Sequence, residues 1–207
     1  MTLLHVISSP RKKRSASLEV ANAFIDAWMA KNPLGTTDRL NVWELDLPPF
    51  DSEALEAKYA GIEGRKLTAQ QEATWTKIKI LAGHFLRANL IVFSLPMWNF
   101  GIPYRLKHLI DAISQKDILF TFDEKGLSGL LGGKTAVVIG ARGVYLGRDF
   151  PLEEFDHHTG YMSTWCRMVG IKEIHNVIVE KTLLGAEVDR AARAKACTEA
   201  IALAQSL

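Results

Sequence analysis

A loop rich in hydroxyl and basic side chains lies between the first apolar run of the chain and its first amphipathic stretch. Residues 8 to 17 read Ser-Ser-Pro-Arg-Lys-Lys-Arg-Ser-Ala-Ser. A helix start offers unpaired backbone N–H groups and the positive end of the helix dipole, and serine hydroxyls add donors for phosphate oxygens. A helix N-cap needs only one serine, so Ser15 or Ser17 alone would be explained by capping. Several hydroxyls together favour a phosphate-binding site.

The segment after the third apolar run combines aromatic, thioether and amide side chains. It consists of Pro96, Met97, Trp98, Asn99 and Phe100, followed by a glycine. Such residues at the end of a strand can supply flat apolar walls and hydrogen bonds to a planar heterocycle. The alternative is a turn into the next helix, with Trp98 and Phe100 in the core.

A third loop carries three glycines, which allow a ligand to approach the backbone closely. It runs Gly140, Ala141, Arg142, Gly143, Val144, Tyr145, Leu146, Gly147. Its spacing does not fit the Rossmann fingerprint GxGxxG. A Walker A loop is excluded too, because Ser128 stands five residues before Gly133-Lys134-Thr135, where that motif needs glycine. A nucleotide held by serine hydroxyls is the remaining option.

Five short apolar runs with β-branched residues predict strands buried on both faces of a sheet. They cover residues 3–7, 40–45, 90–95, 136–139 and 177–179, with helical periodicities at 18–29, 68–88, 102–113 and over the last 20 residues. This alternation predicts a single α/β domain over residues 1–207. We expect a flavodoxin-like three-layer sandwich: a five-stranded parallel sheet of order 2-1-3-4-5 with helices on both faces, and ligands at the carboxyl ends of its strands. Residues 48–68 are expected to form an irregular insertion.

Composition excludes several classes of protein. The 25 basic and 23 acidic residues give a net charge of +2, too even for a nucleic-acid or membrane partner. Two cysteines without CxxC spacing, and no run long enough for a membrane span, fit a cytoplasmic protein. His157 and His158 are adjacent and expected to form a solvated loop pair, so no metal site is predicted. The serines of the chain do not lie in a GxSxG motif, so a hydrolase triad is not predicted.

The three loops together resemble those of the FMN-dependent NADH-azoreductases, flavodoxin-fold relatives of the NAD(P)H:quinone oxidoreductases. The likeness rests on the Ser-Ser loop that ends in Ser-Ala-Ser, on Pro-Met-Trp-Asn-Phe and on Ala-Arg-Gly-Val, and it extends through nearly the whole chain. The chain departs from many relatives at Ala16, Trp98 and Val144, where glutamine, tyrosine and a second glycine are frequent.

The resemblance implies an FMN site built from the three loops. Its phosphate would be held by Ser9, Ser15, Ala16 and Ser17; its ring would contact Pro96, Met97, Trp98, Asn99 and Phe100, and Ala141, Arg142, Gly143 and Val144 would border the pyrimidine end. From the residues alone, Arg142, Arg148 and the basic run at 11–14 are also candidates for binding a 2′-phosphate of NADPH. No protein side chain would act as the catalytic group, because the flavin carries the hydride.

The resemblance also implies the activity. NADH or NADPH would deliver two electrons, and a quinone or azo compound would accept them in a ping-pong reaction. The alternative is a flavodoxin-like FMN electron carrier without NAD(P)H oxidation of its own, although such carriers are usually strongly acidic. A flavin-free regulatory domain on the same fold is a third reading.

A homodimer is the expected assembly. Residues 161–169 carry a stripe of aromatic and Met side chains at helical spacing, which suits an interface or, equally, a core-facing helix. Relatives are expected to pair through this region and to complete each flavin pocket with partner aromatics. For this chain that nominates Phe120, Tyr145 and Trp165 for the substrate pocket and the dimer interface.

Overall fold

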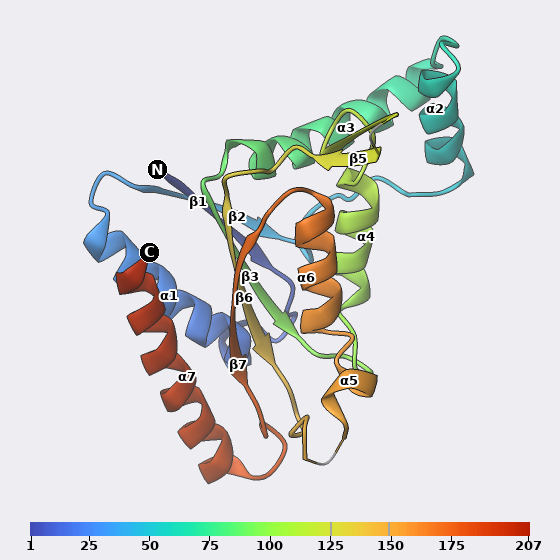
Figure 1. Cartoon of the computed structure of the whole chain (residues 1–207). Coiled ribbons are helices and arrows are strands. Elements are labelled where there is room, and N and C mark those ends of the chain that lie inside the picture. The colour runs from blue at the N-terminus through green and yellow to red at the C-terminus, as the bar shows by residue number, and fades with distance from the viewer. Residues whose placement is uncertain (125, 149) are drawn as a thin grey trace.

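The computed structural model of the protein describes residues 1–124, 126–148 and 150–207. Its centre is a five-stranded parallel sheet with the order β2-β1-β3-β6-β7 (Figure 1). The strands are β1 (Thr2–Ile7), β2 (Thr36–Asn41), β3 (Leu90–Pro96), β6 (Thr135–Ala141) and β7 (Glu173–Val179). Counted within this sheet, the order is the predicted 2-1-3-4-5.

Helices cover both faces of the sheet, as Figure 1 shows. One face packs against α1 (Ala16–Lys31) and α7 (Ala186–Ser206) through a core that includes Phe24 and Trp28. The other face carries α3 (Ala69–Arg87), α4 (Tyr104–Ile113) and α6 (Thr159–Met168) over a second core. Strands β1, β3 and β6 are buried on both sides, which explains their continuous apolar runs.

The predicted second strand was wrong in its position. The apolar run at 40–45 predicted a strand there, but β2 is the polar stretch Thr36–Asn41. As an edge strand, β2 keeps much of its surface in solvent and does not need an apolar sequence. Trp43 and Leu45 lie beyond its end and pack against the core from a loop. The apolar run at 40–45 therefore predicted buried residues correctly, but it did not predict the position of the strand.

The insertion at 48–68 was also not wholly irregular. It contains α2 (Ser52–Ile62), whose N-cap Asp51 accepts hydrogen bonds from the backbone of Glu53 and Ala54. Ala54, Ala57 and Ala60 are buried at a spacing of three, so a stripe of methyl groups holds the helix in place.

Several short elements complete the chain. They are the 3-10 turn η1 (Lys12–Arg14), an antiparallel pair of β4 (Phe120–Asp123) and β5 (Gly126–Gly129), and α5 (Leu152–Phe155). Among the described residues, no helix is both long and apolar enough to cross a membrane.

Candidate functional site

A cleft of about 160 Å³ lies at the carboxyl ends of β1, β3 and β6. The three loops singled out from the sequence meet there. Their lining residues are Ser9, Arg11, Ser15 and Ala16 from the first loop, Pro96, Met97 and Trp98 from the second, and Ala141 and Gly143 from the third. Parallel strands bring their carboxyl ends to one edge, so the sheet order itself assembles this site.

The serine loop begins α1 as predicted. Ser15 is the N-cap, and its Oγ accepts a hydrogen bond from Leu18 N at 3.3 Å. The Ser17 hydroxyl lies 3.2 Å from Ser15 Oγ; it is fully buried and is not part of the cleft lining. Ser9 and Ser15 therefore face the cleft, while Ser17 supports Ser15 from behind. The unpaired N–H groups at the start of this 16-residue helix favour an anion.

The aromatic loop makes a tight two-residue turn. Trp98 and Gly101 exchange backbone hydrogen bonds of 3.0 and 2.9 Å, and Asn99 and Phe100 between them have φ values of 48° and 67°. This left-handed backbone is strained for phenylalanine, and such strain is concentrated at functional sites. The Phe100 ring packs against Phe150 and Phe155, at centroid distances of 5.1 and 4.9 Å. The Asn99 side chain is exposed to solvent. Neither Asn99 nor Phe100 therefore lines the cleft.

Trp98 belongs to an exposed aromatic cluster that the sequence did not reveal. Its ring lies 5.9 Å from that of Trp43 and 6.3 Å from that of Tyr104. Trp43 is fixed in place by a 3.0 Å hydrogen bond from its Nε1 to Ser8 O. The cluster extends the apolar wall of the cleft outward, and long-range packing alone brings its members together.

The glycine loop pairs with the segment that follows β7. Thr182 N donates to Arg142 O at 3.1 Å, and Leu183 N donates to Gly143 O at 3.3 Å. A Cβ at Gly143 would lie 2.5 Å from the end of the Leu183 side chain, so a larger residue here would have to displace that side chain. Thr182 and Leu183 also line the cleft and were missed from the sequence. These residues could have been predicted from their place just after the fifth strand, because that strand ends at the same edge of the sheet as β1, β3 and β6.

The Arg142 side chain points away from the cleft. It is 4% exposed, and its guanidinium donates to Asp156 at 2.8 Å, to Thr159 at 3.2 Å and to Glu180 at 3.4 Å. Burial would raise the pKa of Asp156, but hydrogen bonds from Thr159 and the charge of Arg142 hold it below its usual range. Because its charge is already used inside the protein, the guanidinium is a poor candidate for binding a 2′-phosphate.

The prediction of a solvated histidine pair was wrong for His158. His157 is exposed, but His158 has no exposed surface, and its ring nitrogens have no hydrogen-bond partner among the described residues. Asp156 Oδ1 accepts hydrogen bonds from the backbone of His158 and Thr159, which begins α6 and turns the ring inward beneath Gly140. Burial, and then the charge of Arg142, lower the pKa of His158 to about 4. In the described part of the chain, no group of three or more His, Cys, Asp or Glu residues could hold a metal ion.

The three residues nominated for the substrate pocket and the dimer lie apart. Phe120 and Trp165 line a cavity of about 290 Å³ between α4 and α6, whereas Tyr145 lines a cavity beside β7. Trp165 is 3% exposed, packs edge-on against Phe85 and Phe93, and donates from Nε1 to Ser114 Oγ at 2.9 Å. Of the two readings of the 161–169 stripe, the core-facing one therefore holds for this tryptophan.

The residues of the cleft fit a phosphorylated planar cofactor. Two serine hydroxyls and a helix N-terminus suit a terminal phosphate. Pro96, Met97 and Trp98 offer an apolar wall, and Gly143 leaves its backbone uncovered by a Cβ.

A doubly wound five-stranded sheet with a phosphate-type cleft at its carboxyl edge defines a flavodoxin-like protein. Residues 1–203 match the family described as having a flavodoxin-like fold. The chain is 49% identical, over 207 residues, to FMN-dependent NADH:quinone oxidoreductase 2 of Pseudomonas syringae pv. tomato; the match covers 100% of this chain and 99% of the relative. It is 44% identical to FMN-dependent NADH:quinone oxidoreductase 3 of Pseudomonas fluorescens, over 99% of this chain and 96% of the relative.

The fold agrees with a solved structure as well. Azoreductase from Bacillus anthracis str. Sterne superposes with a TM-score of 0.91 at 22% identity, and the match covers 100% of both chains. The chain belongs to the flavodoxin-like family of FMN-dependent NADH:quinone oxidoreductases.

Proposed function

We propose that this protein binds FMN and passes two electrons from NADH to quinones. One observation carries the proposal: the chain is 49% identical to a named FMN-dependent NADH:quinone oxidoreductase in a match that covers the whole chain. When bound, FMN supplies the two-electron chemistry, and the protein supplies binding, orientation and electrostatics. The names of the relatives favour this enzyme over an FMN electron carrier that does not oxidise NADH.

In this proposal the three loops have separate tasks. Ser9, Ser15 and the backbone at Ala16 hold the phosphate, with Ser17 fixing the Ser15 hydroxyl. The second loop, from Pro96 to Phe100, forms an apolar wall with a rigid turn, and Asn99 and Phe100 act through that turn. The third loop, from Ala141 to Val144, borders the site with its backbone, because the Arg142 side chain is buried elsewhere.

The acceptor site needs space beside the cofactor. The exposed cluster of Trp43, Trp98 and Tyr104 gives planar molecules a surface on which to stack. Quinones are the proposed acceptors. Azo compounds are a second class, since solved structures of the same fold are named azoreductases.

Assembly and location also remain proposals. We expect a homodimer, because most residues that line the cavity between α4 and α6 are apolar or aromatic, and Phe122 of the adjoining β4–β5 pair is 61% exposed. A cytoplasmic location agrees with the free thiols of Cys166 and Cys197.

The visible spectrum of the purified protein, with the released flavin identified by mass, tests the cofactor directly. Bound FMN and NADH oxidation coupled to menadione reduction would support the proposal, and parallel double-reciprocal lines would support a site used by donor and acceptor in turn. Bound FMN without NADH oxidation would favour the electron carrier. Protein that binds no FMN would overturn the assignment.

The serine loop provides a sharper test. Replacing Ser9 and Ser15 together by alanine should weaken FMN binding by about 2 kcal/mol, because each hydrogen bond to a charged phosphate contributes roughly 1 kcal/mol or more. Since Ser15 is also an N-cap, Thr68→Ala at the capping box of α3 is the matched control. The control should lose about 1 kcal/mol of stability and no FMN affinity. Equal FMN affinity in the double variant and in the wild type would contradict the phosphate assignment.

A further inference from the structure

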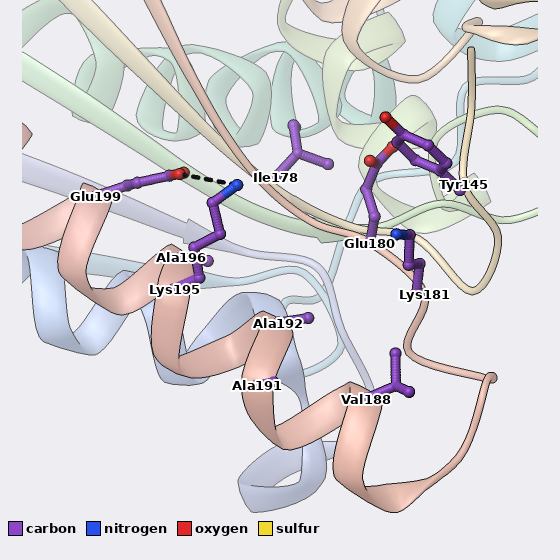
Figure 2. A pocket seen from close by; sticks show the side chains of 10 residues that line it. All are labelled: Tyr145, Ile178, Glu180, Lys181, Val188, Ala191, Ala192, Lys195, Ala196 and Glu199. Carbon is purple, nitrogen blue, oxygen red and sulfur yellow. Dashed lines mark ion pairs between the residues drawn. The ribbon is translucent and has the colours of Figure 1, made fainter. Parts of the chain in front are cut away.

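A second and larger cavity lies along β7 and α7, outside the FMN cleft. Its volume is about 490 Å³, within the usual range for small-molecule sites. Figure 2 shows Tyr145, Glu180 and Lys181 at one end and Lys195 and Glu199 at the other, with small side chains of α7 between them. The cavity therefore combines a flat aromatic ring, an apolar floor, two ammonium groups and two carboxylates. Lys195 forms an ion pair with Glu199 at 3.7 Å, the dashed line in Figure 2, which leaves Lys181 as the ammonium group at the opposite end.

Lys181 is held at this cavity in an unfavourable backbone conformation. Its φ is 64°, in the left-handed region that favours glycine. Its ammonium group lies 4.4 Å from the centroid of the Tyr145 ring, which positions the charge at the end of the cavity. The backbone conformation and the ring contact together fix the ammonium group at this end of the cavity.

One wall separates this cavity from the FMN cleft. The wall consists of residues 142–145 and 180–183, whose backbones are joined by hydrogen bonds from Lys181 N to Val144 O, from Thr182 N to Arg142 O and from Leu183 N to Gly143 O. Gly143, Thr182 and Leu183 face the cleft, whereas Tyr145, Glu180 and Lys181 face the cavity. A ligand that reaches over this wall would occupy both compartments.

We propose that the β7–α7 cavity binds the adenosine diphosphate end of the nicotinamide dinucleotide donor while its nicotinamide end lies over the cleft. This inference rests on the proposed function, and it adds the place where the donor is recognised. Of the reactants, a dinucleotide spans two compartments, whereas a simple quinone fills one. The Lys181 ammonium suits the pyrophosphate, and the Tyr145 ring and the apolar floor suit the purine and its ribose. Glu180 pairs with Arg142 at 3.4 Å and Glu199 pairs with Lys195 at 3.7 Å, so these carboxylates are already used inside the protein.

Lys181→Gly is the first test, because glycine accepts the backbone conformation and the folded structure should be kept. The KM for NADH should rise roughly tenfold with kcat nearly unchanged, as expected for the loss of one charge-assisted contact. With reduced nicotinamide mononucleotide, which lacks the adenosine half, the variant and the wild type should have equal KM. Lys181→Arg, which keeps the charge, should restore most of the affinity for NADH.

Filling the cavity gives an independent test. Ala191 is exposed on α7 and lines the cavity, whereas Ala194 is exposed on the same helix and does not. Ala191→Phe should raise the KM for NADH but not for the mononucleotide, and Ala194→Phe should change neither. Calorimetry with ADP-ribose should show binding to the wild type and binding weaker by about tenfold in Lys181→Gly.

The outcomes separate this inference from the proposed function. Wild-type protein that oxidises NADH but shows no ADP-ribose binding, or variants that change both donors equally, would overturn the donor site and leave the enzyme intact. ADP-ribose binding that depends on Lys181, in a protein without NADH:quinone activity, would support the site and contradict the proposed enzyme.

Discussion

At the residue scale, several ionisable side chains at the carboxyl edge of the sheet are almost completely buried. His158 lies beneath Gly140, and the buried Arg142 guanidinium is shared between Asp156 and Glu180. A buried charge is stable only when it is paired, whereas a buried histidine remains neutral. Arg142 therefore ties the glycine loop to α6 and to the end of β7, and His158 fills the space below as a neutral ring.

His158 should make the stability of the protein depend on pH. Its pKa falls from 6.5 to about 4 on folding, so the unfolded chain takes up a proton between these values and the folded chain does not. The stability contributed by the neutral ring is present above pH 6.5 and is lost as the pH falls toward 4. His5, with its pKa lowered to about 3, acts with the same sign.

Between pH 7 and pH 5, the wild type should therefore lose more unfolding free energy than His158→Gln, by on the order of 1–2 kcal/mol. Urea unfolding at pH 5, 6 and 7 measures this difference. The exposed neighbour His157 provides the control, since His157→Gln should keep the wild-type pH dependence. An unchanged slope in the His158 variant would show that the ring is protonated or solvated in the folded protein.

Predictability differed among the residues of the site. Ser9, Ser15 and the second loop could be placed from the sequence, because hydroxyls at a helix start and aromatics after a strand act through local geometry. The direction of the Arg142 side chain could not, since it depends on carboxylates 14 and 38 positions further along the chain. Trp43 and Tyr104 join Trp98 only through tertiary packing.

At the scale of elements, the contact of the β4–β5 pair with α6 depends on a glycine. A Cβ at Gly129 would lie 2.0 Å from the carbonyl carbon of Val169 and 2.1 Å from the nitrogen of Gly170. Leu131 N also donates to Val169 O at 2.7 Å, so the chain after β5 is fixed to the end of α6. Both neighbours of Gly129 are backbone, which cannot move aside as a flexible side chain would.

Gly129→Ala should therefore destabilise the protein by about 1–3 kcal/mol, the usual cost of overpacking. Gly61→Ala is the control, because that glycine lies within α2 with open space around its Cβ position. The control should gain about 0.5–1 kcal/mol from its higher helix propensity. Denaturant midpoints of the two variants should move in opposite directions, and a Gly129 variant as stable as the wild type would contradict the close contact.

The elements that the sequence predicted well are those with a strong periodic pattern. α3 was expected at 68–88 and spans Ala69–Arg87, with a capping box at Thr68 and Gln71. β2 and α2 were placed poorly, because an edge strand carries polar residues and α2 is held by small alanines. Burial of methyl groups gives a weak hydrophobic signal, although it is enough to hold a helix.

At the scale of the whole molecule, the position of Trp165 changes how the proposed dimer should be tested. This ring contacts Phe85 and Phe93 inside the subunit, so a charge at position 165 would unfold the core whether or not a dimer forms. The β4–β5 pair offers an apolar surface for a partner instead. Phe122 and Leu127 are 61% and 45% exposed there, next to the cavity between α4 and α6.

Phe122→Asp should therefore shift the protein from dimer to monomer while its thermal midpoint stays within a few degrees of the wild type at equal monomer content. An exposed ring that becomes buried on association contributes roughly 1.5–3 kcal/mol, and a carboxylate in its place would be desolvated without a partner. Light scattering at several protein concentrations measures the assembly. Turnover should fall in parallel if partner aromatics complete each site, because a monomer leaves the acceptor side open.

Leu34→Asp provides the matched control, since Leu34 is 94% exposed between α1 and β2, away from the β4–β5 pair. It introduces the same charge and should leave both assembly and turnover unchanged. A wild-type protein that is monomeric and fully active would refute the shared site, and a dimer that survives Phe122→Asp would place the interface on another surface. A monomeric Phe122 variant with full activity would separate assembly from chemistry, because the pocket would then be complete within one subunit.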